Sequence, residues 1–160
     1  MRVLCCLDGT NARQVTTAAE MLSTAEPPTF GLLFVTDTGP RREIEHLRER
    51  FYRHPKPPPR EAEMRQAESL SAQDVLDEGL SHFPGAETLK REGRPEREIV
   101  NTAAEWRADL VVVCPRAEYG GRHKIGPKSV GHVARFVLDH APCPVILVRP
   151  FSREEFPIPR

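Results

Sequence analysis

The stretch Asp109–Arg149 decides the fold, and it reads DLVVVCPRAEYGGRHKIGPKSVGHVARFVLDHAPCPVILVR. Two short apolar runs rich in β-branched residues, Leu110–Val113 and Val145–Val148, are typical of strands buried on both faces. Between them, apolar residues recur at the helical spacing i, i+3, i+4 and i+7: Val130, Val133, Ala134 and Val137. Pro142 and Pro144 end this helix. The order predicts a βαβ unit whose loop follows the carboxyl end of its first strand, where open α/β sheets bind ligands.

The same alternation of strands and helices occurs upstream of this unit. Strands are predicted at Arg2–Leu7, Phe30–Thr36 and Glu87–Glu92, and the first two are apolar. The third is polar apart from Leu89, so we expect it at a sheet edge. Helices with one apolar face are predicted at Ala12–Leu22, Glu61–Phe83 and Pro95–Trp106. This alternation indicates one α/β domain with a single open, five-stranded parallel sheet covered by helices on both faces.

The segment from residue 37 to residue 83 departs from the regular alternation. Arg41–Tyr52 is strongly charged and favours helix, whereas His54–Arg60 holds four prolines in seven residues and predicts a stiff, extended excursion. This charged, Pro-rich excursion is a candidate lid or partner site, and the alternative is a plain surface insertion. We assign residues 1–150 to the domain and residues 151–160 to a polar tail.

Composition narrows the classes of partner. The chain has 160 residues and a formal net charge of zero, so no excess of positive charge favours nucleic acid or an anionic membrane surface. No apolar run reaches the roughly 20 residues of a membrane-spanning helix, and the sequence opens on a predicted strand rather than a signal peptide. The adjacent Cys5 and Cys6 point to opposite sheet faces, and no C-x-x-C pair exists. We expect reduced core thiols in a cytoplasmic protein.

The end of the deciding stretch carries a family resemblance. The residues GHV at 131–133 are followed by VLDHAPCPV at 137–145. This pattern resembles the universal stress proteins, small α/β domains of which many bind ATP, and the similarity extends to residues 3–9 and 109–113. The resemblance implies the strand order 3-2-1-4-5. It also implies a homodimer through strand 145–149, with an added antiparallel pairing there, because an open apolar edge favours pairing.

The nucleotide-binding motif of that family is present in part. The family pattern is Gly-x2-Gly-x9-Gly-Ser/Thr, in which glycines let backbone N–H groups approach phosphates at a helix N-terminus. Here Gly121 and Gly131 keep the x9 spacing, but His132 replaces the Ser or Thr, and Cys114 stands where the first glycine is expected. The loop also holds secondary phosphate candidates: Arg116, Arg122, Lys124 and Lys128. The alternative for these four residues is a solvated basic loop.

Further positions match at the ends of the first two strands. Asp8 matches an acidic residue near the ribose and metal, and Val35 matches a residue whose backbone contacts adenine. The alternative for Asp8 is a helix cap. The resemblance implies ATP, ADP or AMP as the ligand, with Mg²⁺ only if ATP binds. The predicted cofactor-binding residues are Cys6, Asp8, Val35, Val113, Cys114, Gly121, Gly131, His132 and Val133.

Residues 121–129, GRHKIGPKS, nearly match a P-loop. Pro127 is an extra residue that removes an N–H from the phosphate cradle, so we do not assign a P-loop and instead predict Ser129 as a helix N-cap. Sequence spacing places no nucleophile beside a base and no set of metal ligands together. We therefore expect no robust enzymatic activity, and at most weak ATP hydrolysis.

Three functions stay open from the sequence. The first is a stress-response regulator that binds an adenine nucleotide through the degenerate loop after the fourth strand. The second is a dimeric protein-interaction module without nucleotide, which uses its edge strand and the excursion at 41–83. The third is a weak nucleotide hydrolase that uses His132 and the basic loop.

Overall fold

A computed structural model of the chain describes residues 1–22, 26–39, 60–115 and 129–149, and for residues 60–67 it describes the backbone alone. Several predictions from the sequence lie outside the described residues. These are the charged helix at 41–52, most of the Pro-rich excursion, the basic loop at 116–128 and the tail at 151–160.

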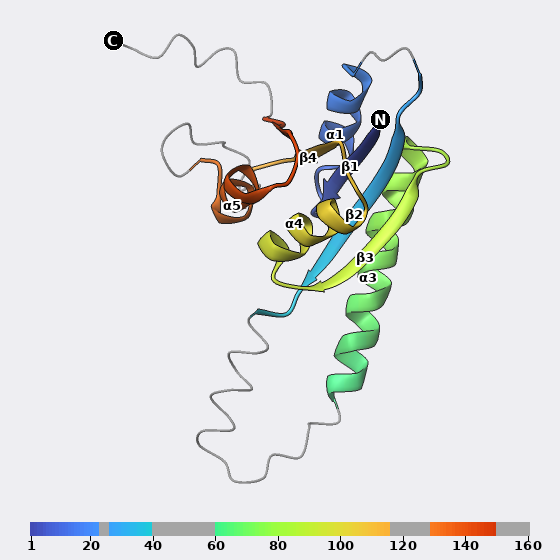
Figure 1. Cartoon of the computed structure of the whole chain (residues 1–160). Helices are drawn as coiled ribbons and strands as arrows, with labels where there is room; N and C mark the ends of the chain where they lie inside the picture. The colour runs from blue at the N-terminus through green and yellow to red at the C-terminus, as the bar shows by residue number, and fades with distance from the viewer. Residues whose placement is uncertain (23–25, 40–59, 116–128, 150–160) are drawn as a thin grey trace, which may run out of the picture.

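The core of the fold is a five-stranded sheet whose strands are all parallel (Figure 1). The strand order is β3-β2-β1-β4-β5, which confirms the expected order. The strands are β1 (Arg2–Leu7), β2 (Thr29–Asp37), β3 (Glu87–Gly93), β4 (Leu110–Val113) and β5 (Val145–Leu147). The polar β3 lies at one edge, as its composition predicts, and the apolar β5 lies at the other.

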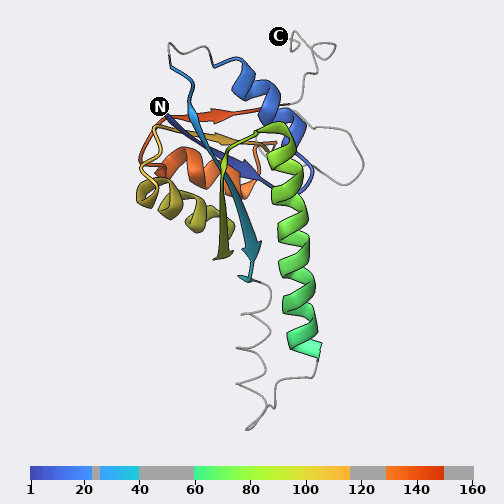
Figure 2. The same ribbon diagram turned by 90° about the vertical axis from the view of Figure 1, so that its right-hand side faces the viewer.

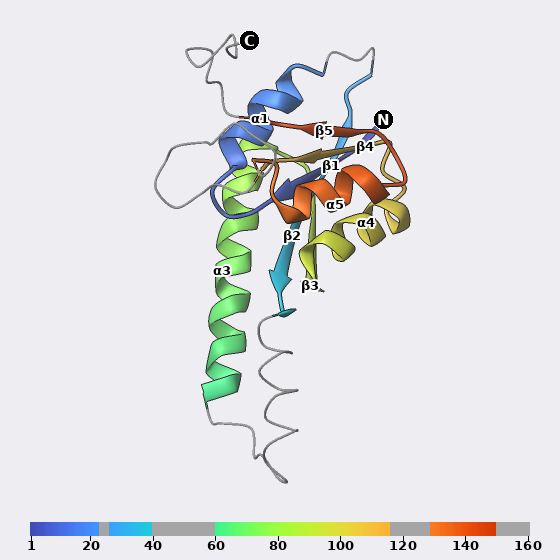
Figure 3. The same cartoon turned by 90° about the vertical axis from the view of Figure 1, so that its left-hand side faces the viewer.

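Helices cover both faces of the sheet (Figures 2 and 3). They are α1 (Ala12–Glu20), α3 (Arg60–His82), α4 (Pro95–Glu105) and α5 (His132–His140). On one face, α1 and α3 enclose a core that contains Cys5, and on the other α4 and α5 enclose a core that contains Cys6. The two adjacent thiols therefore point to opposite faces, as predicted. No helix in the described ranges is long and apolar enough to cross a membrane.

The start of α5 differs from the prediction. The helix begins at His132, so Val130 precedes it, and the N-cap residue is Gly131 rather than Ser129. Gly131 has φ 79°, a left-handed value that glycine adopts at little cost and that a right-handed helix does not continue. The Ser129 hydroxyl instead accepts a hydrogen bond from Arg149 Nη1 at 3.1 Å. The prediction of a Ser129 cap is therefore wrong.

Two segments, the end of β2 and the amino-terminal half of α3, extend past the carboxyl end of β1. β2 pairs with β1 up to Phe34, and its residues 35–37 continue beyond Leu7 while they stay paired with β3. The carboxyl-terminal half of α3 packs on the sheet, with Ala72 and Leu76 buried on it and Phe83 buried directly after it, whereas its amino-terminal half extends past the tip of β2 (Figure 2).

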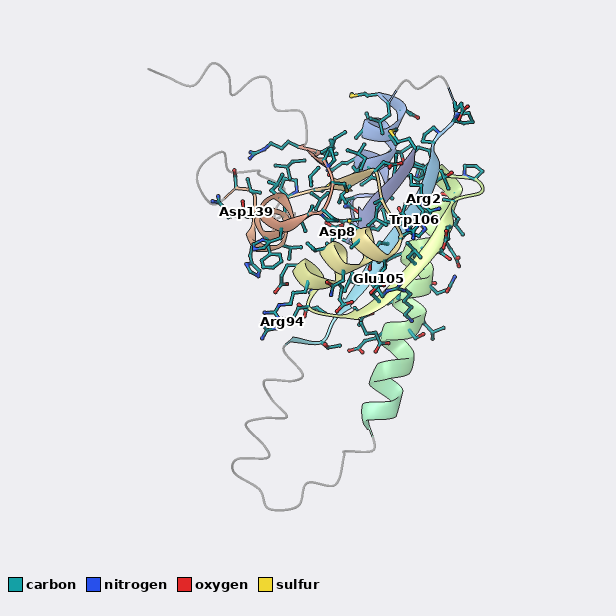
Figure 4. The ribbon with its side chains drawn as sticks, viewed as in Figure 1. Arg2, Asp8, Arg94, Glu105, Trp106 and Asp139 are labelled. Atoms are coloured by element: carbon teal, nitrogen blue, oxygen red, sulfur yellow. The ribbon has the colours of Figure 1, made fainter. Side chains whose placement is uncertain are left out.

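Trp106 lies at the opposite end of the sheet, near the amino ends of β1 and β3. Its indole Nε1 donates to Glu87 Oε2 at 2.9 Å, and the Arg2 guanidinium carbon lies 4.1 Å from the ring centroid, so the two side chains lie together (Figure 4). The ring packs directly on the backbone of Gly31 in β2. A Cβ at that position would approach two ring atoms to 2.9 Å.

We therefore predict that Gly31→Ala destabilises the fold by about 1–3 kcal/mol through overpacking. Urea denaturation measures this loss as a lower midpoint. The same substitution in a Trp106→Leu background should cost clearly less, because the shorter side chain removes the ring atoms that the new methyl group meets. An equal cost in both backgrounds would show that the indole is not the obstacle.

Candidate functional site

A cavity of about 610 Å³ opens at the carboxyl ends of β1, β2 and β4. Its volume is within the range of small-molecule sites. The chain leaves β1 toward β2 on one side and later returns to β4 on the other, which places this cavity at the switch point of the sheet. The predicted binding residues that line it are Cys6, Asp8, Val35, Val113, Cys114, Gly131, His132 and Val133.

The remaining predicted site residues lie outside the described part of the chain. These are Gly121 and the phosphate candidates Arg116, Arg122, Lys124 and Lys128. Their contribution to the site stays a prediction.

Asn11 organises the turn between β1 and α1. Its side chain is buried, with 4% of the residue exposed. The amide Nδ2 donates to the Cys6 carbonyl oxygen at 3.0 Å, and Oδ1 accepts from the Asp8 backbone N–H at 3.0 Å. Asn11 is the N-cap residue of α1, yet its side chain bonds back to β1 and does not cap the helix. Asn11 lines the cavity and was not among the predicted site residues. The available signal was an Asn directly after a strand and an Asp-Gly-Thr turn.

Asp8 is held in a fixed orientation at the rim of the cavity. Its Oδ1 accepts from the Thr10 backbone N–H at 2.8 Å and from the Thr10 hydroxyl at 2.9 Å, which is an Asx-turn. The helix α1 begins later, at Ala12. Asp8 therefore does not cap α1, and the capping alternative is wrong.

The floor of the cavity is apolar, and two thiols belong to it. Burial raises the pKa of Cys114 to about 11, against the opposing effect of a hydrogen bond with the Asn11 side chain. Burial likewise raises the pKa of Cys6. Both thiols are therefore protonated at neutral pH and act as small apolar groups rather than as nucleophiles. The Thr36 hydroxyl, on the extended end of β2, is buried and has no hydrogen-bond partner among the described residues.

Two helix N-termini meet at the cavity. His132 is the first residue of α5, and Glu96 lies in the first turn of α4. The His132 Nε2 atom is 3.5 Å from Glu96 Oε1, and the exposed fractions of the two side chains are 76% and 11%. The α5 N-terminus can attract an anion through its unpaired N–H groups, while Glu96 places a carboxylate beside it.

No metal-binding centre is evident in the part of the chain that the structure describes. Within those residues, no three His, Cys, Asp or Glu side chains gather in an arrangement that would hold a metal ion. The site as described therefore consists of an apolar floor, an acidic rim and two helix N-termini.

Comparison with known proteins agrees with this architecture. A universal stress protein from Thermus aquaticus is 33% identical over 86 residues, a match that spans 54% of this chain and 58% of that relative's length. The solved structure of universal stress protein UspA from Lactobacillus plantarum superposes with a TM-score of 0.66 at 23% identity, covering 93% of this chain and 97% of that one.

A second solved structure is a universal stress protein family member from Arabidopsis thaliana with AMP bound. It has a TM-score of 0.58 at 18% identity and covers 96% of this chain and 94% of its own. The model of the universal stress protein family matches residues 1–149. The chain therefore belongs to the universal stress protein family.

Proposed function

We propose that this chain is a stress-response regulator whose state depends on an adenine nucleotide bound in the cavity. One observation carries the proposal. Residues from three strand ends and from the α5 N-terminus, which the family resemblance implied as binding residues, line a single cavity whose volume suits a small-molecule ligand. The AMP-bound Arabidopsis relative supports the choice of ligand class, since the two chains share the fold.

The groups around the cavity suit the parts of a nucleotide. The base would lie on the apolar floor beside the backbone of Val35, with the unpartnered Thr36 hydroxyl available for a polar edge of the ring. The oriented Asp8 carboxylate would accept hydrogen bonds from ribose hydroxyls. A phosphate would face the N-terminus of α5, where Gly131 brings the backbone close because it carries no Cβ.

We propose regulation by occupancy rather than by turnover. The thiols of the floor are protonated, and the imidazole of His132 faces a carboxylate rather than a nucleophile. If ATP is the ligand, the Asp8 carboxylate is the group we expect beside its Mg²⁺. The four cysteines are free thiols, which supports a reducing compartment such as the cytoplasm.

The first test is whether nucleotide copurifies with the protein. Denaturing the protein and analysing the supernatant by chromatography with mass detection should release ATP, ADP or AMP. Added ligand at about 100 times its Kd should raise the free energy of unfolding by about 2.7 kcal/mol. A protein that neither carries nor is stabilised by any of the three nucleotides contradicts the proposal.

Asp8→Asn should weaken nucleotide binding by about tenfold, because the amide can still accept the Thr10 hydrogen bonds but lacks the charge that favours ribose hydroxyl donors. Isothermal titration calorimetry measures the change in Kd. The matched control is Asp139→Asn, which neutralises an exposed carboxylate of α5 that does not line the cavity. Equal affinities for the two variants would remove Asp8 from the site.

We also propose a homodimer that forms through β5, because the composition of this edge strand favours pairing. β5 has the sequence Val-Ile-Leu, all three residues are half-buried, and the strand pairs with β4 on one side. An apolar edge strand is a template for pairing with another chain. The protein-interaction function considered from the sequence would act through this same edge.

Leu147→Lys should therefore convert a dimer into an 18.0 kDa monomer, which sedimentation velocity detects. A charged side chain at the pairing edge opposes association because the charge must lose its hydration. Leu70→Lys is the control, because Leu70 is 61% exposed on α3, away from β5. A wild-type chain that sediments as a monomer at all concentrations contradicts the proposal.

A further inference from the structure

The mouth of the cavity is acidic. Four carboxylates line it, and each comes from a different part of the fold: Asp8 after β1, Asp37 at the end of β2, Glu68 on α3 and Glu96 on α4. Among the described lining residues, His132 is the one side chain that can carry a positive charge. A concave site lined by one sign of charge focuses its field on the ligand.

Glu96 lies beside the α5 N-terminus, the place proposed above for a phosphate. Its carboxylate lies 3.5 Å from the imidazole of the first α5 residue, and the side chain is 11% exposed. Poor solvation strengthens its repulsion of a nearby anion. The imidazole neutralises this charge only in its protonated form. Glu96 therefore opposes the attraction that the α5 N-terminus exerts on a phosphate chain.

The other carboxylates favour donors over anions. Asp8 is oriented by Thr10, and Asp37 Oδ1 accepts the Gly39 N–H at 2.8 Å, so both are anchored at the rim. Anchored carboxylates accept hydrogen bonds from hydroxyl groups and repel phosphate oxygens. The apolar floor of the cavity can pack against a flat adenine base. The ligand that suits all of these groups is thus a nucleoside that carries at most a short anionic group.

We propose that the cavity selects adenine ligands with at most one phosphate, adenosine or AMP, and discriminates against ADP and ATP, with Glu96 as the specificity-determining residue. This inference rests on the proposed adenine-nucleotide function and specifies its ligand class. Each additional phosphate brings about one further negative charge toward the acidic mouth. Repulsion between like charges at low exposure is expected to cost about tenfold or more in affinity.

The test is calorimetric titration of ligand-free protein with adenosine, AMP, ADP and ATP in Mg²⁺-free buffer. The Kd for ATP should exceed that for AMP by about tenfold or more. Glu96→Gln should reduce this ratio by about threefold to tenfold through tighter ATP binding, with a smaller change for AMP. Glu98→Gln is the control. It removes a carboxylate from the same first turn of α4, but Glu98 faces Gly93 and does not line the cavity.

The outcomes separate this inference from the function on which it rests. Tighter binding of ATP than of AMP by the wild-type protein overturns the inference and leaves adenine-nucleotide binding intact. If no adenine compound binds, both are overturned. A preference for AMP that Glu96→Gln and Glu98→Gln leave equally unchanged overturns the role of Glu96. The wild-type series alone decides the ligand class, so a variant that fails to fold does not block the test.

Discussion

The hydrogen bonding of β1 along both of its edges is the constraint on which the rest of the structure depends. β1 pairs in parallel with β2 on one side and with β4 on the other, and its residues from Val3 to Leu7 are buried. Parallel pairing sends each connection across a face of the sheet. The connections on the two sides of β1 diverge at its carboxyl end, so a cavity opens there. The groups at the carboxyl ends of β1 and β4 take their positions from that divergence.

Much of this architecture could be predicted from the sequence, because strand and helix periods are local signals. The β-branched run Leu110–Val113 and the proline at the first position of α4 marked their elements correctly. The polar β3 indicated its own edge position, since a strand with Lys90 and Arg91 cannot be buried on both sides. The full strand order, in contrast, followed from the family resemblance and not from periodicity.

The parts of the site that sequence did not reveal depend on contacts between distant elements. Asn11 follows an Asp-Gly-Thr turn in the sequence, and only the structure shows that its amide bonds back to Cys6. Asp37, Glu68 and Glu96 are ordinary surface carboxylates in the sequence, yet the end of β2, the length of α3 and the first turn of α4 bring them around one cavity. Local pattern cannot contain this information, because each carboxylate belongs to a different element.

His132 stands where the family motif has Ser or Thr, and this difference shows that the backbone fold can be kept while the chemistry of the ligand site changes. Gly131 keeps the backbone conformation that opens α5, so the helix N-terminus still faces the cavity without a serine or threonine beside it. The imidazole instead pairs with Glu96, and a side chain of α4 then belongs to the electrostatics of the α5 N-terminus. In the function proposed here, backbone geometry preserves a place for an anion, while the side chains around it limit how much negative charge that place accepts. The second effect, as proposed, depends on carboxylates that come from four parts of the fold, all of them outside the glycine motif that defines the first.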